Sequence, residues 1–135
     1  NITHVGPVGA GHSMKLLHNF VSLGAVTLIA EAAACAQAYG VPAASFVEVL
    51  AKGGGGGIAL DRIKPYLLSQ DPSGLRFSIA NARKDLDYYN TMAADAAAHQ
   101  SVAAAVLATL EGALADGGPQ ALVPQLASLL QPKKS

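Results

Sequence analysis

The sequence predicts an all-α domain in which two long helices pack together with several shorter ones. Three observations support this prediction. Alanine, the best helix former, fills about one position in five of the 135 residues. Glycine and proline gather at a few places that divide the chain into helix-sized segments. Only residues 2–5 resemble a strand, and one strand cannot make a sheet.

The first two helices are predicted on either side of a clear break. One should begin near His12 or Ser13 and run to Tyr39, because Gly40 and then a proline stop it there. The second should cover residues 43–52 and end at the glycine run 53–57, whose backbone freedom disfavours a helix interior.

The remaining helices follow from the same punctuation. We expect helices at residues 59–68, 77–98, 102–116 and 119–130. Pro65 should kink the first of these or restart it. Ser101 is expected to cap the helix that follows it, and Pro119 to open the last one.

Composition restricts the classes of function. The length fits one domain, 51% of the residues are hydrophobic and 13% are charged, so part of the apolar surface is expected to meet a partner. Nine basic and nine acidic residues leave no basic stripe for nucleic acid. One cysteine and no secretory signal favour the cytoplasm. Polar residues interrupt the apolar stretch 16–38, so no membrane span is expected.

Lys15 and Asn19 are four residues apart, which places them on one face of the first helix. The positive end of the helix dipole disfavours an ammonium near a helix start, and this suits a group that transfers protons. A solvated surface lysine remains the alternative interpretation. The glycine-rich segment before them, residues 6–11, is a weak nucleotide-binding signal because no second strand follows, and we interpret it as a hinge.

Two motifs resemble those of the β-hydroxyacid dehydrogenase family, which includes 3-hydroxyisobutyrate dehydrogenase and tartronate semialdehyde reductase. Residues 6–19, GPVGAGHSMKLLHN, are similar to the family signature G-x-x-G-x-G-x-x-x-K-x-x-N-N. Phe77 followed by Lys84-Asp85-Leu86 resembles the family motif F-x6-K-D-L. Two departures concern the substrate: His18 stands where the family often has a first asparagine, and the glycine run 53–57 stands where it often has a serine among small residues.

The resemblance implies the helical C-terminal domain of the 6-phosphogluconate dehydrogenase superfamily, spanning residues 1–135. It also implies that an N-terminal Rossmann domain, absent from this chain, binds most of the NAD or NADP. By carry-over, Lys15 is the catalytic acid/base, Asn19 holds a small hydroxyacid substrate, and Lys84 approaches the cofactor. The lysine at position 15 argues against the related imine reductases. The family also pairs subunits through these helices, so we expect a homo-oligomer.

Other interpretations are kept beside this one. Without the motif, Lys84 would be surface charge paired with Asp85 or Asp87. Cys35 is expected to be a small core residue, and the histidines show no metal-ligand spacing, so we expect no metal. The fragment alone is expected to be inactive. The alternative function is a non-enzymatic helical interaction or oligomerisation module.

Overall fold

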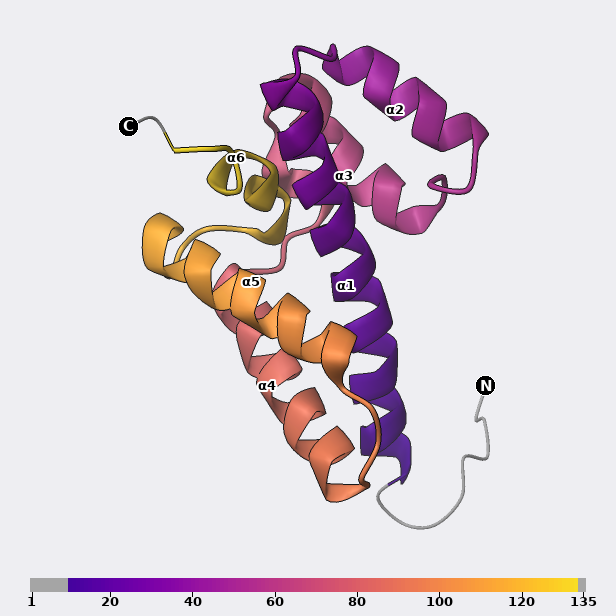
Figure 1. Ribbon diagram of the computed structural model, residues 1–135, viewed down its shortest axis with the longest axis vertical. Helices are drawn as coiled ribbons and strands as arrows, with labels where there is room; N and C mark the ends of the chain where they lie inside the picture. The colour runs from indigo at the N-terminus through magenta and orange to yellow at the C-terminus, as the bar shows by residue number, and fades with distance from the viewer. Residues whose placement is uncertain (1–9, 134–135) are drawn as a thin grey trace.

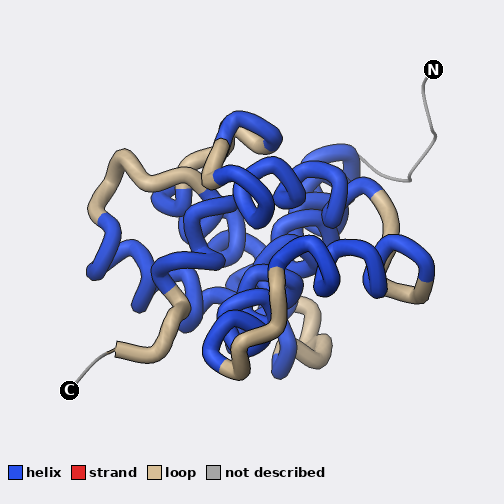
Figure 2. Tube along the Cα trace, turned by 90° about the horizontal axis from the view of Figure 1, so that it is seen from above, coloured by secondary structure: helices blue, strands red, loops and turns tan. Residues whose placement is uncertain are grey.

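The computed structural model describes residues 10–133, and within them every regular element is helical (Figure 2). The elements follow one another as α1 (Ala10–Ala38), α2 (Ala43–Lys52), α3 (Ile58–Ser69), η1 (Pro72–Gly74), α4 (Ile79–Asp95), α5 (Ser101–Gly117), η2 (Val123–Gln125) and α6 (Leu126–Leu129). The all-α prediction is therefore confirmed. The strand-like residues 2–5 and most of the glycine-rich segment lie outside the described residues.

Helix α1 is the axis of the fold. Its 29 residues span about 43 Å, long enough to contact two separate groups of helices. Figure 1 shows α4 and α5 beside the half where α1 begins, and α2, α3 and α6 around the half where it ends. Between these groups lies one buried core that includes Leu23, Leu60, Leu86 and Leu110. Each end of α1 is thereby fixed against different partners.

By length and composition, α1 also meets the criteria for a membrane span from Gly11 to Ala38, with a mean hydropathy of 1.5. Core helices of soluble proteins meet the same criteria. Here α1 packs against α3, α4 and α6, and Val26 and Ala30 are completely buried between them. Packing within the domain therefore accounts for part of its apolar composition, since 39% of the most apolar window is buried.

Most predicted boundaries agree with the structure to within two or three residues, and α2 agrees at both ends. Gly40 ends the first helix with a φ of +82°, a left-handed conformation that glycine adopts without strain. Helix α3 does not restart at Pro65 but continues through it to Ser69. Helix α4 begins at Ile79, two residues later than predicted, because the hydroxyl of Ser78 accepts a hydrogen bond from the backbone N–H of Asn81.

Two predictions about helix starts are wrong. Ser101 does not cap α5; Gln100 occupies the cap position, and its side chain donates to Asn90 instead. Pro119 does not open a helix, and α6 is only four residues long. The reason is tertiary: Ala121 accepts a hydrogen bond from the backbone N–H of Ile79, which holds this segment extended against the start of α4.

Cys35 is exposed, not a core residue as expected. It lies on α1 directly after Ala34, which is buried. The alanine-rich surroundings of Cys35 gave no periodic signal to separate the buried face from the exposed one.

Candidate functional site

The two motif segments meet where α1 crosses α4. Asn19 of α1 donates a hydrogen bond from Nδ2 to Oδ2 of Asp85 on α4, over 3.0 Å. These residues are 66 positions apart in the sequence, so the contact exists only in the folded domain. Since the pair is partly buried, the charge-assisted bond is stronger than an exposed one. The substrate-binding candidate of one motif is therefore held by the other motif.

The orientation of the Asn19 amide follows from its two neighbours. An ionised carboxylate only accepts hydrogen bonds, so the amide must present its NH₂ group to Asp85. Its oxygen then faces Nδ1 of His18 at 3.2 Å, and the imidazole donates from that nitrogen. Each amide has two N–H groups and two lone pairs. One N–H and one lone pair of Asn19 therefore remain for a ligand.

Lys15 lies one turn before Asn19, and its side chain is exposed. The sequence predicted a helix start at His12 or Ser13, which would place Lys15 in the first turn. The helix begins at Ala10 instead, so Lys15 lies in the second turn. The influence of the helix dipole is therefore weaker than expected. Among residues 10–133 no ion pair involves Lys15, and its ammonium group can reach a molecule placed over this face of α1.

Lys84 is also exposed, on the first half of α4 beside Asp85. The surface-charge alternative predicted an ion pair with Asp85 or Asp87. Neither pair forms within the described part of the chain. The ion pairs present there join Lys52 to Glu48 and Lys133 to Asp116. Lys84 is thus an exposed lysine that makes no ion pair within the described part of the chain.

An aromatic pair that the sequence did not predict supports this arrangement. Phe20 and Tyr89 stack with their ring centroids 4.4 Å apart. Phe20 follows Asn19 directly, and Tyr89 lies one turn after Asp85, so the rings fix the register of α1 against α4. Leu86, next to Asp85, is completely buried and anchors the same part of α4. In the sequence, this aromatic pair could be found only from its distance to the motif residues: Phe20 is one residue after Asn19, and Tyr89 is four residues after Asp85.

The face that carries Lys15 and Asn19 is open. A hollow between the start of α1 and the end of α4 is lined by residues such as His12, Leu16 and Tyr88, but Lys15 and Asn19 do not line it. The glycine run 53–57 forms the connection between α2 and α3, far from the start of α1 (Figure 1). The structure therefore joins Asn19 to the Lys84-Asp85 motif and separates the glycine run from it.

Other chemistry is poorly supported at this site. Among residues 10–133, no group of three histidine, cysteine, aspartate or glutamate side chains could hold a metal ion. Of the glycine-rich segment, Ala10 and Gly11 belong to α1, and residues 6–9 lie outside the described residues. Beside the oriented amide of Asn19, α1 carries the exposed ammonium group of Lys15, and α4 carries that of Lys84.

A comparison with known protein families gives one match. The family model described as the NAD-binding domain of NADP-dependent 3-hydroxyisobutyrate dehydrogenase matches residues 9–130. The matched segment contains all of α1 to α6 and includes Lys15, Asn19 and Lys84. No curated protein matches the sequence.

Proposed function

Because a single family model covers nearly its whole length, this chain belongs to the family of the NAD-binding domain of NADP-dependent 3-hydroxyisobutyrate dehydrogenase, and we propose that it helps to oxidise a small β-hydroxyacid. The observation that carries this proposal is the hydrogen bond between Asn19 and Asp85. It joins α1, which carries Lys15 and Asn19, to α4, on which Lys84 directly precedes Asp85, and this contact supports the proposal.

The side chains fit the parts of such a reaction. Lys15, in its amine form, accepts the proton of the substrate hydroxyl and returns it in the reverse direction. Asn19 uses its remaining N–H and lone pair to bind the substrate next to Lys15. The exposed ammonium of Lys84, which makes no ion pair among residues 10–133, suits an anionic group of the cofactor. NAD or NADP supplies the hydride acceptor when it is bound.

The rest of the cofactor site is proposed to lie on an N-terminal Rossmann domain outside these 135 residues. Pyrophosphate and ribose are usually bound by a βαβ unit, and residues 10–133 contain none. The isolated chain should therefore bind NAD or NADP weakly and show no dehydrogenase activity. Calorimetric titration tests this part of the proposal, and micromolar binding by the isolated chain would contradict it.

Self-association is the second part of the proposal. Four large apolar side chains on α1 are exposed although they share one face: Met14, Leu17, Val21 and Leu28, which we call the exposed stripe. Val21 is 69% exposed and Leu28 is 64% exposed. A contiguous apolar surface of this kind favours association, and a second copy of the chain offers the same stripe.

The catalytic role of Lys15 is tested in the full-length enzyme. We expect Lys15→Ala to lower kcat roughly 10²- to 10⁴-fold, the usual contribution of a positioned acid/base. Lys15→Arg should be almost as inactive, because a guanidinium stays protonated near neutral pH. Asn19→Ala should mainly raise KM.

The matched control is Lys64→Ala, which removes another exposed lysine, from α3. It should leave kcat unchanged. A Lys15→Ala enzyme that kept most of its kcat would reduce Lys15 to surface charge. It would also remove the mechanistic part of the proposal while leaving the family assignment intact.

A further inference from the structure

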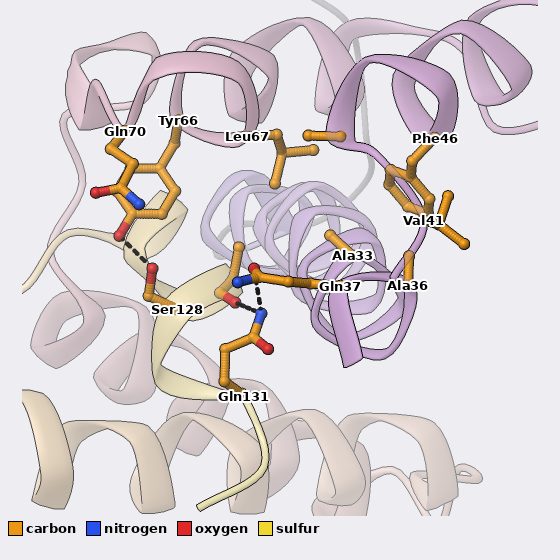
Figure 3. Close-up of a pocket in the computed structure, with 12 residues that line it drawn as sticks. Ala33, Ala36, Gln37, Val41, Phe46, Tyr66, Leu67, Gln70, Ser128 and Gln131 are labelled. Atoms are coloured by element: carbon orange, nitrogen blue, oxygen red, sulfur yellow. Dashed lines mark hydrogen bonds between the residues drawn. The ribbon is translucent and has the colours of Figure 1, made fainter. Parts of the chain in front are cut away.

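A cavity lies near the end of α1 opposite to the Lys15 site. It opens to solvent and is bounded by the last turns of α1, by α2 and α3, and by the segment around α6 (Figure 3); Gln37, Gln70 and Ser128 at its wall are exposed. Its volume is about 190 Å³. Gln37, which lines it, is 18 residues after Asn19 on the same helix, so about 27 Å separates the two sites along α1. The cavity is therefore a separate site.

One part of the cavity wall is apolar. To this part, helix α1 contributes the methyl groups of Ala33 and Ala36, which leave space that larger side chains would fill. Phe46 and Leu67 face this space from α2 and α3. An apolar cavity of about 150 Å³ is sufficient for benzene. The volume here therefore suits one aromatic ring with a small substituent.

The other part of the wall carries amides. Nε2 of Gln131 donates to Oε1 of Gln37 over 2.8 Å and to the carbonyl oxygen of Ala127 over 3.0 Å. Both hydrogens of the Gln131 amide are thereby used, which leaves its Oε1 as an acceptor. Nε2 of Gln37 remains as a donor, and the side chain of Gln70 makes no hydrogen bond within the described residues. The cavity thus offers both donors and acceptors.

The charge of the wall limits the ligand further. None of the residues that line the cavity is ionisable except Tyr66, whose hydroxyl is hydrogen-bonded to Ser128 at 2.6 Å. A charged group that gave up part of its water in this cavity would find no opposite charge among the lining side chains, and that loss is costly. A carboxylate or an ammonium is therefore a poor ligand, whereas a neutral group that both donates and accepts is a good one.

We propose that this cavity binds a small neutral molecule with one aromatic ring and one primary carboxamide. The ring occupies the space above Ala33 and Ala36, between Phe46 and Leu67. The carboxamide donates to Oε1 of Gln131 and accepts from Nε2 of Gln37. This ligand site does not depend on the proposed dehydrogenase function, because no residue of the Lys15 site takes part in it.

Benzamide is the probe. Titration of the isotope-labelled chain, followed by two-dimensional NMR, should give saturable shifts of the side-chain amides of Gln37 and Gln131. Benzoate, which has a similar size and a negative charge, should bind at least tenfold more weakly. Equal binding of benzoate, or the absence of saturation up to the solubility of benzamide, would overturn the proposal. Shifts confined to residues near Lys15 would also overturn it.

Two variants locate the site. Ala36→Leu fills the cavity and should weaken benzamide binding at least tenfold. Ala32→Leu, an equal change at an exposed position of the same helix outside the cavity, should have no effect. Gln131→Leu keeps the cavity but removes the acceptor, and it should weaken binding roughly two- to tenfold, the range for one neutral hydrogen bond. Unchanged binding in both Ala36→Leu and Gln131→Leu would contradict the proposed site.

Discussion

The hydrogen bond between Asn19 and Asp85 should contribute measurably to both stability and catalysis. A hydrogen bond to a charged group contributes about 1.5–3 kcal/mol to stability. This pair is only partly buried, so solvent screening lowers the expected coupling free energy to about 1–2 kcal/mol. The 3.0 Å distance between Nδ2 and Oδ2 is short enough for the full interaction.

A double-mutant cycle measures this coupling free energy. The variants are Asn19→Ala, Asp85→Ala and the double variant, each unfolded with urea as the isolated chain. Each single change should lower the free energy of unfolding by about 1–2 kcal/mol, and the double change should cost less than their sum. Asp87→Ala is the matched control, because it removes an exposed carboxylate from the same helix.

The catalytic consequence is tested with Asp85→Asn in the full-length enzyme. An asparagine at position 85 can present either an oxygen or an NH₂ group, so Asn19 no longer has one preferred orientation. We expect kcat/KM to fall roughly tenfold, as for an indirect positioning residue. A coupling free energy below about 0.3 kcal/mol would refute the reasoning. The two single changes would then be additive, which means that the Asn19 and Asp85 side chains do not stabilise each other.

Three further predictions concern other parts of the domain. Gly74→Ala should lower the free energy of unfolding by about 1–3 kcal/mol in urea unfolding, because its Cβ would overlap the backbone carbonyl oxygen of Arg62 on α3. Changing Val21 and Leu28 together to glutamate should shift the chain towards monomer in sedimentation experiments, because both belong to the exposed stripe. The pKa of Asp71 lies below its ordinary value because the backbone N–H of Ser73 donates a hydrogen bond to its carboxylate. Folding therefore favours the ionised carboxylate, which stabilises the native state above about pH 4 and ceases to do so at lower pH. In thermal unfolding, Asp71→Asn should be less stable than the wild type above about pH 4, and the difference should vanish at lower pH.

Controls separate these effects from general damage. Gly112→Ala, in the interior of α5 where an added Cβ meets nothing within 4 Å, should be neutral or stabilising. Val49→Glu changes a side chain on α2 that is 69% exposed, as Val21 is, and it should not alter sedimentation. If Gly112→Ala destabilised the domain as much as Gly74→Ala, the loss at Gly74 could not be attributed to overlap of its Cβ with α3. A wild-type chain that stays monomeric at high concentration would contradict self-association.

Much of the fold could be predicted from local sequence. Alanine-rich segments with high helix propensity fixed the number and type of the elements, and glycine and proline fixed most of their ends. Gly40 is an example, because a glycine followed two residues later by a proline is a common helix stop, and Gly40 adopts the left-handed conformation typical of one. The motif residues Lys15, Asn19 and Lys84 could also be located, although their roles remain a prediction.

The errors occurred where distant segments decide the local structure. Residues after Pro119 have a local helix-start signal, yet Ala121 pairs with the backbone of Ile79 and stays extended. Cys35 lies in an alanine-rich stretch in which the spacing of larger apolar residues does not distinguish the buried face. Local propensity is worth a fraction of a kcal/mol per residue, and tertiary hydrogen bonds and packing exceed it.

The sequence by itself determined that the chain is helical and which two motifs it carries. Only the tertiary structure decided that Asn19 is held by Asp85, that Phe20 stacks on Tyr89, and that Lys84 has no ion-pair partner within residues 10–133. The physical reason is that helix formation depends on residues three or four positions apart. The orientation of a side chain at a site depends instead on which helix faces meet, and that is settled by burying the core between α1 and α4.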